Sequence, residues 1–173
     1  MEEETKIDFV NFMDKYTEAL TKMMTTAKKS KLFPVSNFLG LKTCLEMLAQ
    51  KEGSEDLTNL PILLDKINME FDKACSQASL EEIETVINQI QRVIAESSTL
   101  KSEANAQLEA DRQAYRVAQN DNPEAARDLR DYISKSENEI LEAESALLVR
   151  EQIMRSLNNL RNIKKDEKKT PLV

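Results

Sequence analysis

Histidine and tryptophan are absent from this 173-residue sequence, and glycine is nearly absent, with two residues. Without histidine the chain has no Ser-His or Cys-His nucleophile pair and no histidine general base. The Glu-x-x-His motif of ferritin-like di-metal bundles is excluded for the same reason. Gly40 and Gly53 alone cannot build a glycine-rich phosphate loop. We therefore expect no enzymatic activity, no cofactor and no metal.

Cysteine is also scarce, and long apolar runs are missing. Cys44 and Cys75 are the only two cysteines, so they form neither a disulfide framework nor a zinc-ligand set. Both lie among apolar positions, which favours buried thiols. No apolar run approaches the roughly 18 residues of a membrane span, and the acidic start MEEETKIDF is unlike a signal peptide. The expected location is the cytoplasm, with the nucleus left open.

The charge is acidic overall and unevenly distributed. The net charge is −7 and the pI is about 4.9, whereas a nucleic-acid-binding protein needs a basic face. Residues 78–121 carry four Lys/Arg and eight Asp/Glu, but residues 150–169 carry seven and three. Nucleic acid and membrane are therefore not expected partners, and a disordered basic tail is predicted over residues 165–173.

The composition predicts long helices. Charged residues make up 32% and aromatics only 5% of the chain. Few aromatics indicate a thin core, and few glycines and prolines leave few helix breaks. The expected fold is all-α, with an N-terminal three-helix segment packed on the base of a long antiparallel two-helix coiled-coil hairpin.

Three amphipathic helices are predicted in the N-terminal segment, residues 1–78. The first covers about residues 6–29. Ser36 or Asn37 is a suitable N-cap for the second, and Gly53 would follow its end. The third is expected to begin around Asn59–Pro61, with the proline in its first turn. Their apolar faces are, in order, Phe9, Met13, Tyr16, Leu20, Met23 and Ala27; Phe38, Leu41, Leu45 and Leu48; and Leu60, Leu64, Ile67, Phe71 and Ala74.

Two longer helices are predicted over residues 79–164. The first opens with a capping box, in which Ser79 is followed three residues later by Glu82. Each helix carries a ladder of positions at alternating steps of three and four, the pattern of a coiled-coil seam. The seam is rich in isoleucine and leucine at the base, about 80–100 with 140–163. From Ser97, near the outer end of this base, it continues through Lys101 and Asp111, which indicates a thin, projecting two-helix arm.

The segment Asn120–Pro123 separates the two long helices. Asn122 is a good N-cap, Pro123 suits the first helical position, and Glu124 favours the positive helix start. A helix that stops and restarts at once is typical of antiparallel neighbours, so a hairpin tip is predicted near residues 119–123. The alternative is one long curved helix with a proline kink.

Folding the chain about residue 122 aligns the two ladders. Tyr115 then lies opposite Leu129, Ala104 opposite Ile140 and Ile87 opposite Leu157. Small residues often face large ones in this alignment, as interdigitated packing requires.

Some carboxylates are spaced as ligands of a metal would be. Glu81 with Glu84 and Glu139 with Glu142 are pairs three residues apart. Asn120-Asp121-Asn122 resembles the start of a calcium loop, but the turn glycine and the terminal glutamate are missing. We interpret all of these side chains as solvated helix surface.

These features predict a non-enzymatic interaction or assembly protein, such as a subunit, adaptor or accessory factor of a larger complex. A protein partner would bind the arm, and a homo-oligomer through the hairpin is possible. The alternatives are a membrane-surface or lipid-binding helical protein and an enzyme or metal protein that uses carboxylates alone. Tyrosine and arginine are common at binding hot spots. The candidate partner-binding residues are therefore Arg112, Tyr115, Arg116, Arg127, Arg130 and Tyr132, on both sides of the tip.

Overall fold

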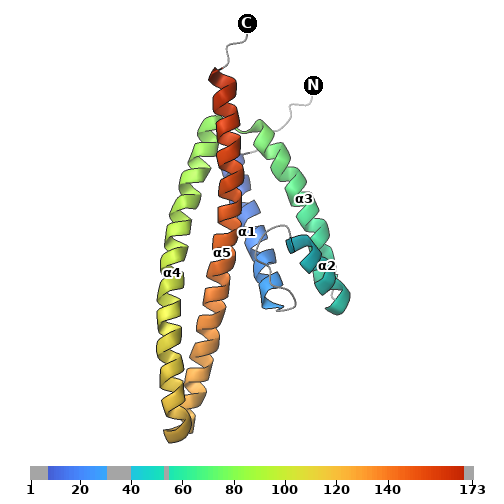
Figure 1. The fold of residues 1–173 in the computed structure, drawn as a ribbon. Coiled ribbons are helices and arrows are strands. Elements are labelled where there is room, and N and C mark those ends of the chain that lie inside the picture. Colours follow the sequence, from blue (N-terminus) through green and yellow to red (C-terminus); the bar gives the residue numbers. More distant parts are fainter. Residues whose placement is uncertain (1–7, 31–39, 53–54, 170–173) are drawn as a thin grey trace.

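The computed structural model describes residues 8–30, 40–52 and 55–169, and in these ranges it contains five helices and no strand. The helices are α1 (Phe9–Lys29), α2 (Leu41–Glu52), α3 (Glu55–Gln77), α4 (Leu80–Asp121) and α5 (Pro123–Lys169). α4 and α5 run antiparallel along their length, and α1, α2 and α3 lie beside the base of this pair (Figure 1). The predicted all-α fold with a helical hairpin is confirmed.

A single residue, Asn122, connects the two long helices. It is the C-cap of α4, where its N–H donates to the Ala118 carbonyl at 2.8 Å. Its own carbonyl accepts from the Ala126 N–H at 3.0 Å, and its side-chain Oδ1 accepts from the Ala125 N–H at 3.3 Å. Asn122 thus ends one helix and begins the next, so the break is shorter than the predicted four residues.

The start of α4 is fixed by the predicted capping box. The Glu82 N–H donates to Ser79 Oγ, and the Ser79 N–H donates to Glu82 Oε1, both at 3.1 Å. The two bonds satisfy donors that a helix start otherwise leaves open.

Ion pairs across the hairpin agree with the predicted alignment. Asp111 is aligned with Ile133, and the next residue, Arg112, reaches Glu137, one turn beyond Ile133, at 3.4 Å. At the base, Ile83 is aligned with Arg161. The next residue, Glu84, lies 3.8 Å from Lys165, which is one turn beyond Arg161. Surface pairs of this kind add little stability, but they favour one register.

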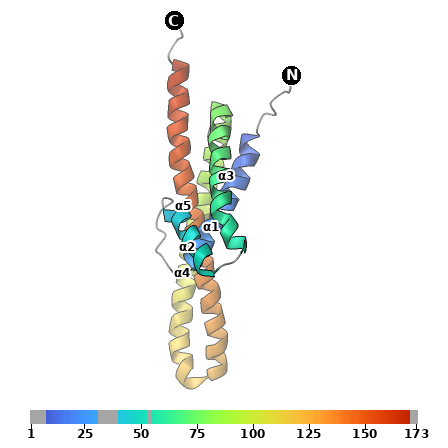
Figure 2. The same cartoon turned by 90° about the vertical axis from the view of Figure 1, so that its right-hand side faces the viewer.

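The core lies at the base of the hairpin, where α1 packs against α5 and α4, and α3 and α2 pack outside α1 (Figure 2). The whole predicted apolar face of α1 is buried. α1 is joined to α3 by the ring of Tyr16, which stacks on Phe12 and Phe71 with centroids 5.8 Å and 4.7 Å away. Its hydroxyl donates to Asn68 Oδ1 at 2.8 Å, which satisfies the one polar atom of a buried ring.

α1 covers positions of α5 that do not belong to the coiled-coil ladder. Ser145, Val149 and Ile153 follow one another at steps of four residues, and all three are buried. Ser145 is fully buried, and its hydroxyl donates to the Leu141 carbonyl at 2.8 Å. A small side chain that satisfies its own hydroxyl lets another helix approach closely. α5 therefore has two packed faces at the base.

Beyond the base, α4 and α5 continue alone as the arm (Figure 1). Its buried apolar residues are few: Leu108, Ala118 and Ala126. Its interior also holds the buried polar residues Asp111 and Ser136. The Asp111 carboxylate accepts from Gln107 Nε2 at 2.9 Å. The arm is thus thinly packed, as its ladder predicts.

Two predicted boundaries differ in the structure. α3 begins at Glu55, so its proline, Pro61, lies in the second turn instead of the first. α5 continues to Lys169, so residues 165–169 are helix and not a disordered tail. Lys164 donates to the Ala78 carbonyl and Lys165 pairs with Glu84, which anchors the end of α5 on the start of α4.

Residues 170–173 and the predicted caps of α2, namely Ser36, Asn37 and Gly53, lie outside the described residues. Within the described part of the chain, no helix combines the length and apolarity needed to cross a bilayer.

Candidate functional site

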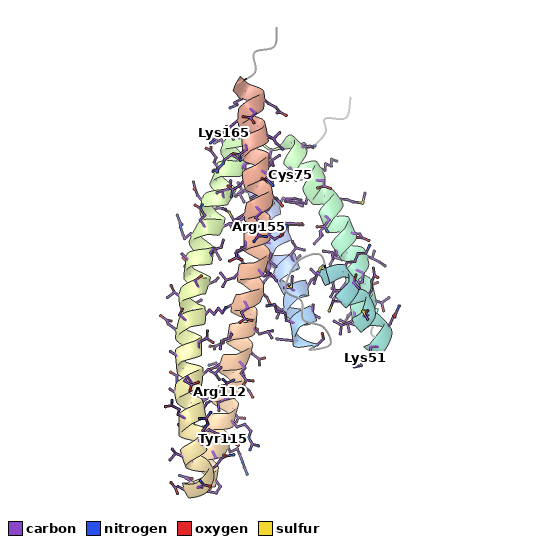
Figure 3. The ribbon with its side chains drawn as sticks, viewed as in Figure 1. Lys51, Cys75, Arg112, Tyr115, Arg155 and Lys165 are labelled. Carbon is purple, nitrogen blue, oxygen red and sulfur yellow. The ribbon has the colours of Figure 1, made fainter. Side chains whose placement is uncertain are left out.

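The six predicted binding residues lie within about three turns of the tip. α4 carries Arg112, Tyr115 and Arg116, and α5 carries Arg127, Arg130 and Tyr132. The first two of these, labelled in Figure 3, lie near the distal end of the arm, far from Cys75 and Arg155 at the base. The tip is therefore separated from the N-terminal helices by a stretch of hairpin in which α4 and α5 pack only against each other.

Tyr115 and Arg130 bond directly across the hairpin. Arg130 Nη2 donates to the Tyr115 hydroxyl at 2.9 Å, and the guanidinium carbon lies 5.8 Å from the ring centroid. That distance is near the limit for a cation–π contact, so the hydrogen bond is the main interaction. It lowers the pKa of Tyr115 from its ordinary value, and Gln119 acts in the same direction. The same bond raises the pKa of Arg130.

Arg116 and Arg127 are exposed, and neither makes a hydrogen bond or an ion pair with any residue that the structure describes. The positive charge of Arg112 is partly compensated by a 3.4 Å ion pair with Glu137. Both side chains of this pair are about half exposed. The tip therefore presents guanidinium groups whose hydrogen-bond donors remain available to another molecule.

Tyr132 lies on the other side of the arm. It follows Arg130 by two residues, which turns it about 200° around the helix axis. Its side chain is 59% exposed and makes no bond within the described chain. The six predicted residues thus form two surfaces, one with four arginines and Tyr115 and the other with Tyr132.

The sequence analysis did not identify one exposed apolar residue at the tip. Val117 is 66% exposed and lies five residues before the Asn122 cap. Its only signal in the sequence is an apolar side chain next to, but not on, the ladder. A single exposed valine is common on protein surfaces, and that explains why the pattern did not single it out.

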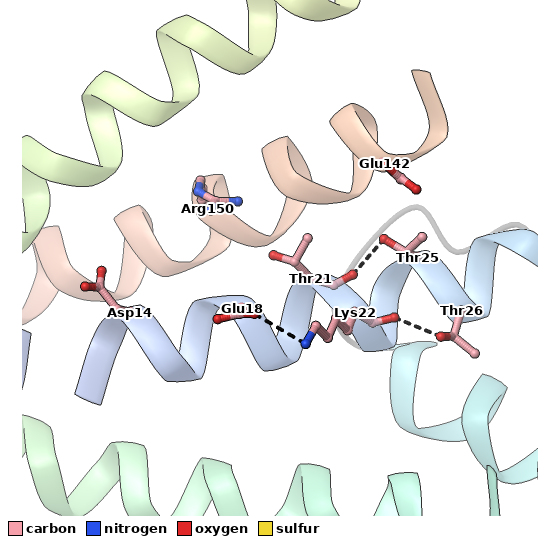
Figure 4. A pocket seen from close by; sticks show the side chains of 8 residues that line it. All are labelled: Asp14, Glu18, Thr21, Lys22, Thr25, Thr26, Glu142 and Arg150. Atoms are coloured by element: carbon pink, nitrogen blue, oxygen red, sulfur yellow. Dashed lines mark hydrogen bonds and ion pairs between the residues drawn. The ribbon is translucent and has the colours of Figure 1, made fainter. Parts of the chain in front are cut away.

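An open cleft of about 930 Å³ lies between α1 and α5, away from the tip (Figure 4). Most of its polar groups are already bonded within α1. Lys22 Nζ lies 3.3 Å from Glu18 Oε1, and the Thr25 and Thr26 hydroxyls donate to carbonyls one turn back. Its lining is Asp14, Glu18, Thr21, Lys22, Thr25, Thr26, Glu142 and Arg150. The charges of this lining are mixed, and among these eight residues no nucleophile is paired with a base.

Arg150 is the distinctive residue of this cleft. It occupies a ladder position of α5 but is half-buried between α1 and the hairpin, and Nη1 donates to the Ala146 carbonyl at 3.3 Å. Burial lowers its pKa, and the nearby Asp14 opposes that effect. The sequence signal was an arginine within an apolar ladder, but the ladder alone does not show that α1 covers it.

In each of the two carboxylate pairs with metal-ligand spacing, which we interpreted as solvated helix surface, one glutamate pairs with a lysine. Glu84 pairs with Lys165, and Glu142 lies 3.8 Å from Lys29. Among the described residues, no group of three or more potential ligands could hold a metal ion.

Both cysteines are free thiols, with Cys44 buried and Cys75 half-buried. Burial is the main cause that raises the pKa of Cys75 to about 11, with Asp72 adding to it and Lys164 opposing it. A thiol that holds its proton this firmly is a weak nucleophile at neutral pH.

No protein-family model matches the chain, no curated protein matches it significantly, and no solved structure does.

Proposed function

We propose that the protein is a non-enzymatic interaction or assembly protein that binds a protein partner through the tip of its coiled-coil arm. The observation that carries this proposal is the group of tip side chains that have no bonding partner in the described chain, namely Arg116, Arg127 and Tyr132. Arginine and tyrosine combine broad contact area with hydrogen bonding, which is why they dominate binding hot spots.

The base and the arm differ in their packing, which supports separate roles for the two parts. The apolar core lies at the base, whereas the arm buries only a few apolar residues and extends past α1, α2 and α3. A two-helix arm with a polar interior contributes little to the stability of the base. A separate role for the arm, contact with another protein, accounts for its length. The free thiols of Cys44 and Cys75 support a reducing compartment such as the cytoplasm.

Site-specific photo-cross-linking tests the proposal. A photo-reactive amino acid is placed at Val117 or Tyr132 on the tip, and at Met69 on α3 as a control of similar exposure, 73% against 66% and 59%. In the native cell, the tip positions are expected to give discrete cross-linked products that Met69 does not give. Products at Met69 alone would move the binding surface to the N-terminal helices and refute a tip site. A product of twice the chain mass would identify a second copy as the partner.

A further inference from the structure

We propose that one side of the tip is an arginine face that binds a short acidic segment of a partner protein through its carboxylates. The arginine face consists of Arg112, Arg116, Arg127 and Arg130. The inference rests on the proposed function and adds the side of the arm and the chemistry of the partner.

The four arginines lie on the same side of the hairpin. Arg112 and Arg116 are four residues apart on α4, and Arg127 and Arg130 are three apart on α5, so each pair shares a helix face. The Arg112–Glu137 ion pair places these two residues on one side. Glu137 is two turns from Arg130 on α5 and therefore faces the same way.

The four arginines also lie at nearly the same height along the arm. The Tyr115–Arg130 bond brings residues 115 and 130 level, which places Arg127 beside residues 117 and 118 of α4. From Arg112 to that level is about 9 Å along the axis. Four guanidinium groups thus share a short stretch of surface, in a protein whose net charge is −7.

Few direct ion pairs engage these arginines within the described part of the chain. Arg116 and Arg127 have no partner among the described residues. Arg130 donates to the phenol of Tyr115, and Asp131 adds only a weaker electrostatic attraction without a direct ion pair. Only Arg112 pairs with a carboxylate, at 3.4 Å and with both side chains exposed.

The choice of arginine indicates a planar anion as the ligand. Four of the eight arginines in the chain fall within residues 112–130, whereas no lysine occurs between Lys101 and Lys135. A guanidinium donates two parallel hydrogen bonds to a carboxylate, which an ammonium group cannot do. The Tyr115 hydroxyl also holds the Arg130 guanidinium in place before a ligand arrives.

The surroundings favour a short acidic segment over an extended polyanion. Glu109 and Glu137 lie on the base side of the arginine face, and Asp131 lies one turn from Arg127. Duplex DNA carries a charge about every 1.7 Å and would run onto these carboxylates. A partner helix or loop with two to four acidic residues over roughly two turns matches the face and avoids its acidic border.

Binding of synthetic peptides to the full-length protein tests the proposal. Two labelled helical peptides are compared, one with glutamate and one with glutamine at the same four positions. At low ionic strength the glutamate peptide is expected to bind and the glutamine peptide not to bind. Salt at roughly 0.15 M is expected to weaken the binding, because exposed charges are screened.

Matched variants locate the binding. Arg116→Gln with Arg127→Gln is expected to weaken binding of the glutamate peptide by about tenfold or more. Arg92→Gln with Arg155→Gln removes the same charge from exposed positions of the base and is expected to leave binding unchanged. Arg116→Lys with Arg127→Lys keeps the charge but not the paired donors, so an intermediate affinity is expected.

Several outcomes would overturn the proposal: no binding of the glutamate peptide, equal binding of both peptides, or equal losses in the tip and base variants. Tighter arginine-dependent binding of duplex nucleic acid or anionic vesicles would also overturn it and assign the face to a polyanion. If tip cross-links to a native partner persist in the Arg116→Gln, Arg127→Gln variant, the arginine face fails and the tip remains the binding site. If the unmodified protein gives no tip cross-link, the proposed function fails first.

Discussion

Buried apolar side chains are expected to contribute more to the stability of the fold at the base than in the arm. Ile83, Ile87 and Leu157 are almost completely buried among residues from several helices. Leu108 in the arm is also buried, but only α4 and α5 enclose it, and its aligned partner is the small residue Ser136. A cavity is harder to close in the first setting than in the second, because neighbours on all sides hold the walls in place.

We expect Ile87→Ala to lower the free energy of unfolding by about 2–5 kcal/mol. Leu108→Ala is expected to cost less, because the two helices of the arm can close on the gap. Urea denaturation followed by circular dichroism measures both. Leu100→Ala, at a position 61% exposed, is the control and should change stability by less than about 0.5 kcal/mol. Equal losses for Ile87→Ala and Leu108→Ala would show that the arm is packed as tightly as the base.

Stability is expected to fall in alkaline solution because of Cys75. Its folded-state pKa of about 11 exceeds the ordinary thiol value of 9.0, so the folded protein retains a proton that the unfolded chain releases. This stabilising effect is complete below pH 9 and is lost as the pH rises toward 11. Cys75→Ala should reduce the slope of stability against pH in this window, as measured by urea denaturation at a series of pH values. An unchanged slope would assign the alkaline loss to other groups, such as Tyr16, whose pKa burial also raises.

At the scale of the element, helix ends in this chain are set by a few polar side chains. Ser79 and Glu82 begin α4, and Asn122 both ends α4 and begins α5. Each of these signals is local in sequence, so the sequence analysis identified all three. The start of α3 was misplaced for the same reason. Pro61 suggested a first turn, but the preceding residues from Glu55 onward extend the helix.

We expect Ser79→Ala to lower stability by about 1 kcal/mol, because it removes the acceptor for the Glu82 N–H. Ser98→Ala is the matched control. Ser98 is exposed in the middle of α4, where alanine favours the helix, so stability should stay the same or rise slightly. A thermal melt followed by circular dichroism compares the two. Equal effects would mean that the capping box contributes nothing beyond ordinary helix propensity.

At the scale of the molecule, the hairpin sets the overall dimensions. α4 has 42 residues and is therefore about 63 Å long. A compact domain of 173 residues has a radius of gyration of about 16 Å. We expect small-angle X-ray scattering of the monomer to give roughly 20–25 Å instead. A value near that of a compact domain would mean that the arm folds back on the base.

A shortened variant provides the control for this measurement. Removal of residues 101–114 and 130–143 takes two heptads from each helix and keeps the ladder in register. The arm should become shorter by about 21 Å, the helix length of 14 residues, while the base keeps its core. The maximum dimension from scattering should fall accordingly. An unchanged value would show that the arm does not determine the length of the molecule.

The arrangement of the molecule was less predictable than its elements. The ladders predicted how α4 meets α5, because both helices carry the same pattern. They did not predict that α1 crosses Ser145 and Val149. These two residues lie off the ladder, and the α4–α5 pairing alone does not explain why they are buried. The burial of Arg150 and the cleft beside it depend on that crossing. Similarly, the six candidate tip residues were predicted as one site. Tyr132 lies about 200° around the α5 axis from Arg130 and therefore faces the opposite side of the arm.

The order of the helices also governs how the chain folds during synthesis. α1 is made first, yet its apolar face packs against Val149 and Ile153 near the end of the chain. About 120 residues separate Lys29 from Val149, which a ribosome takes on the order of 6–24 s to add. During that interval the face of α1 has no native partner except what α2, α3 and the base of α4 provide. The nascent chain thus exposes a methionine-rich apolar stripe until the hairpin closes, and this is the period in which a chaperone would act on it.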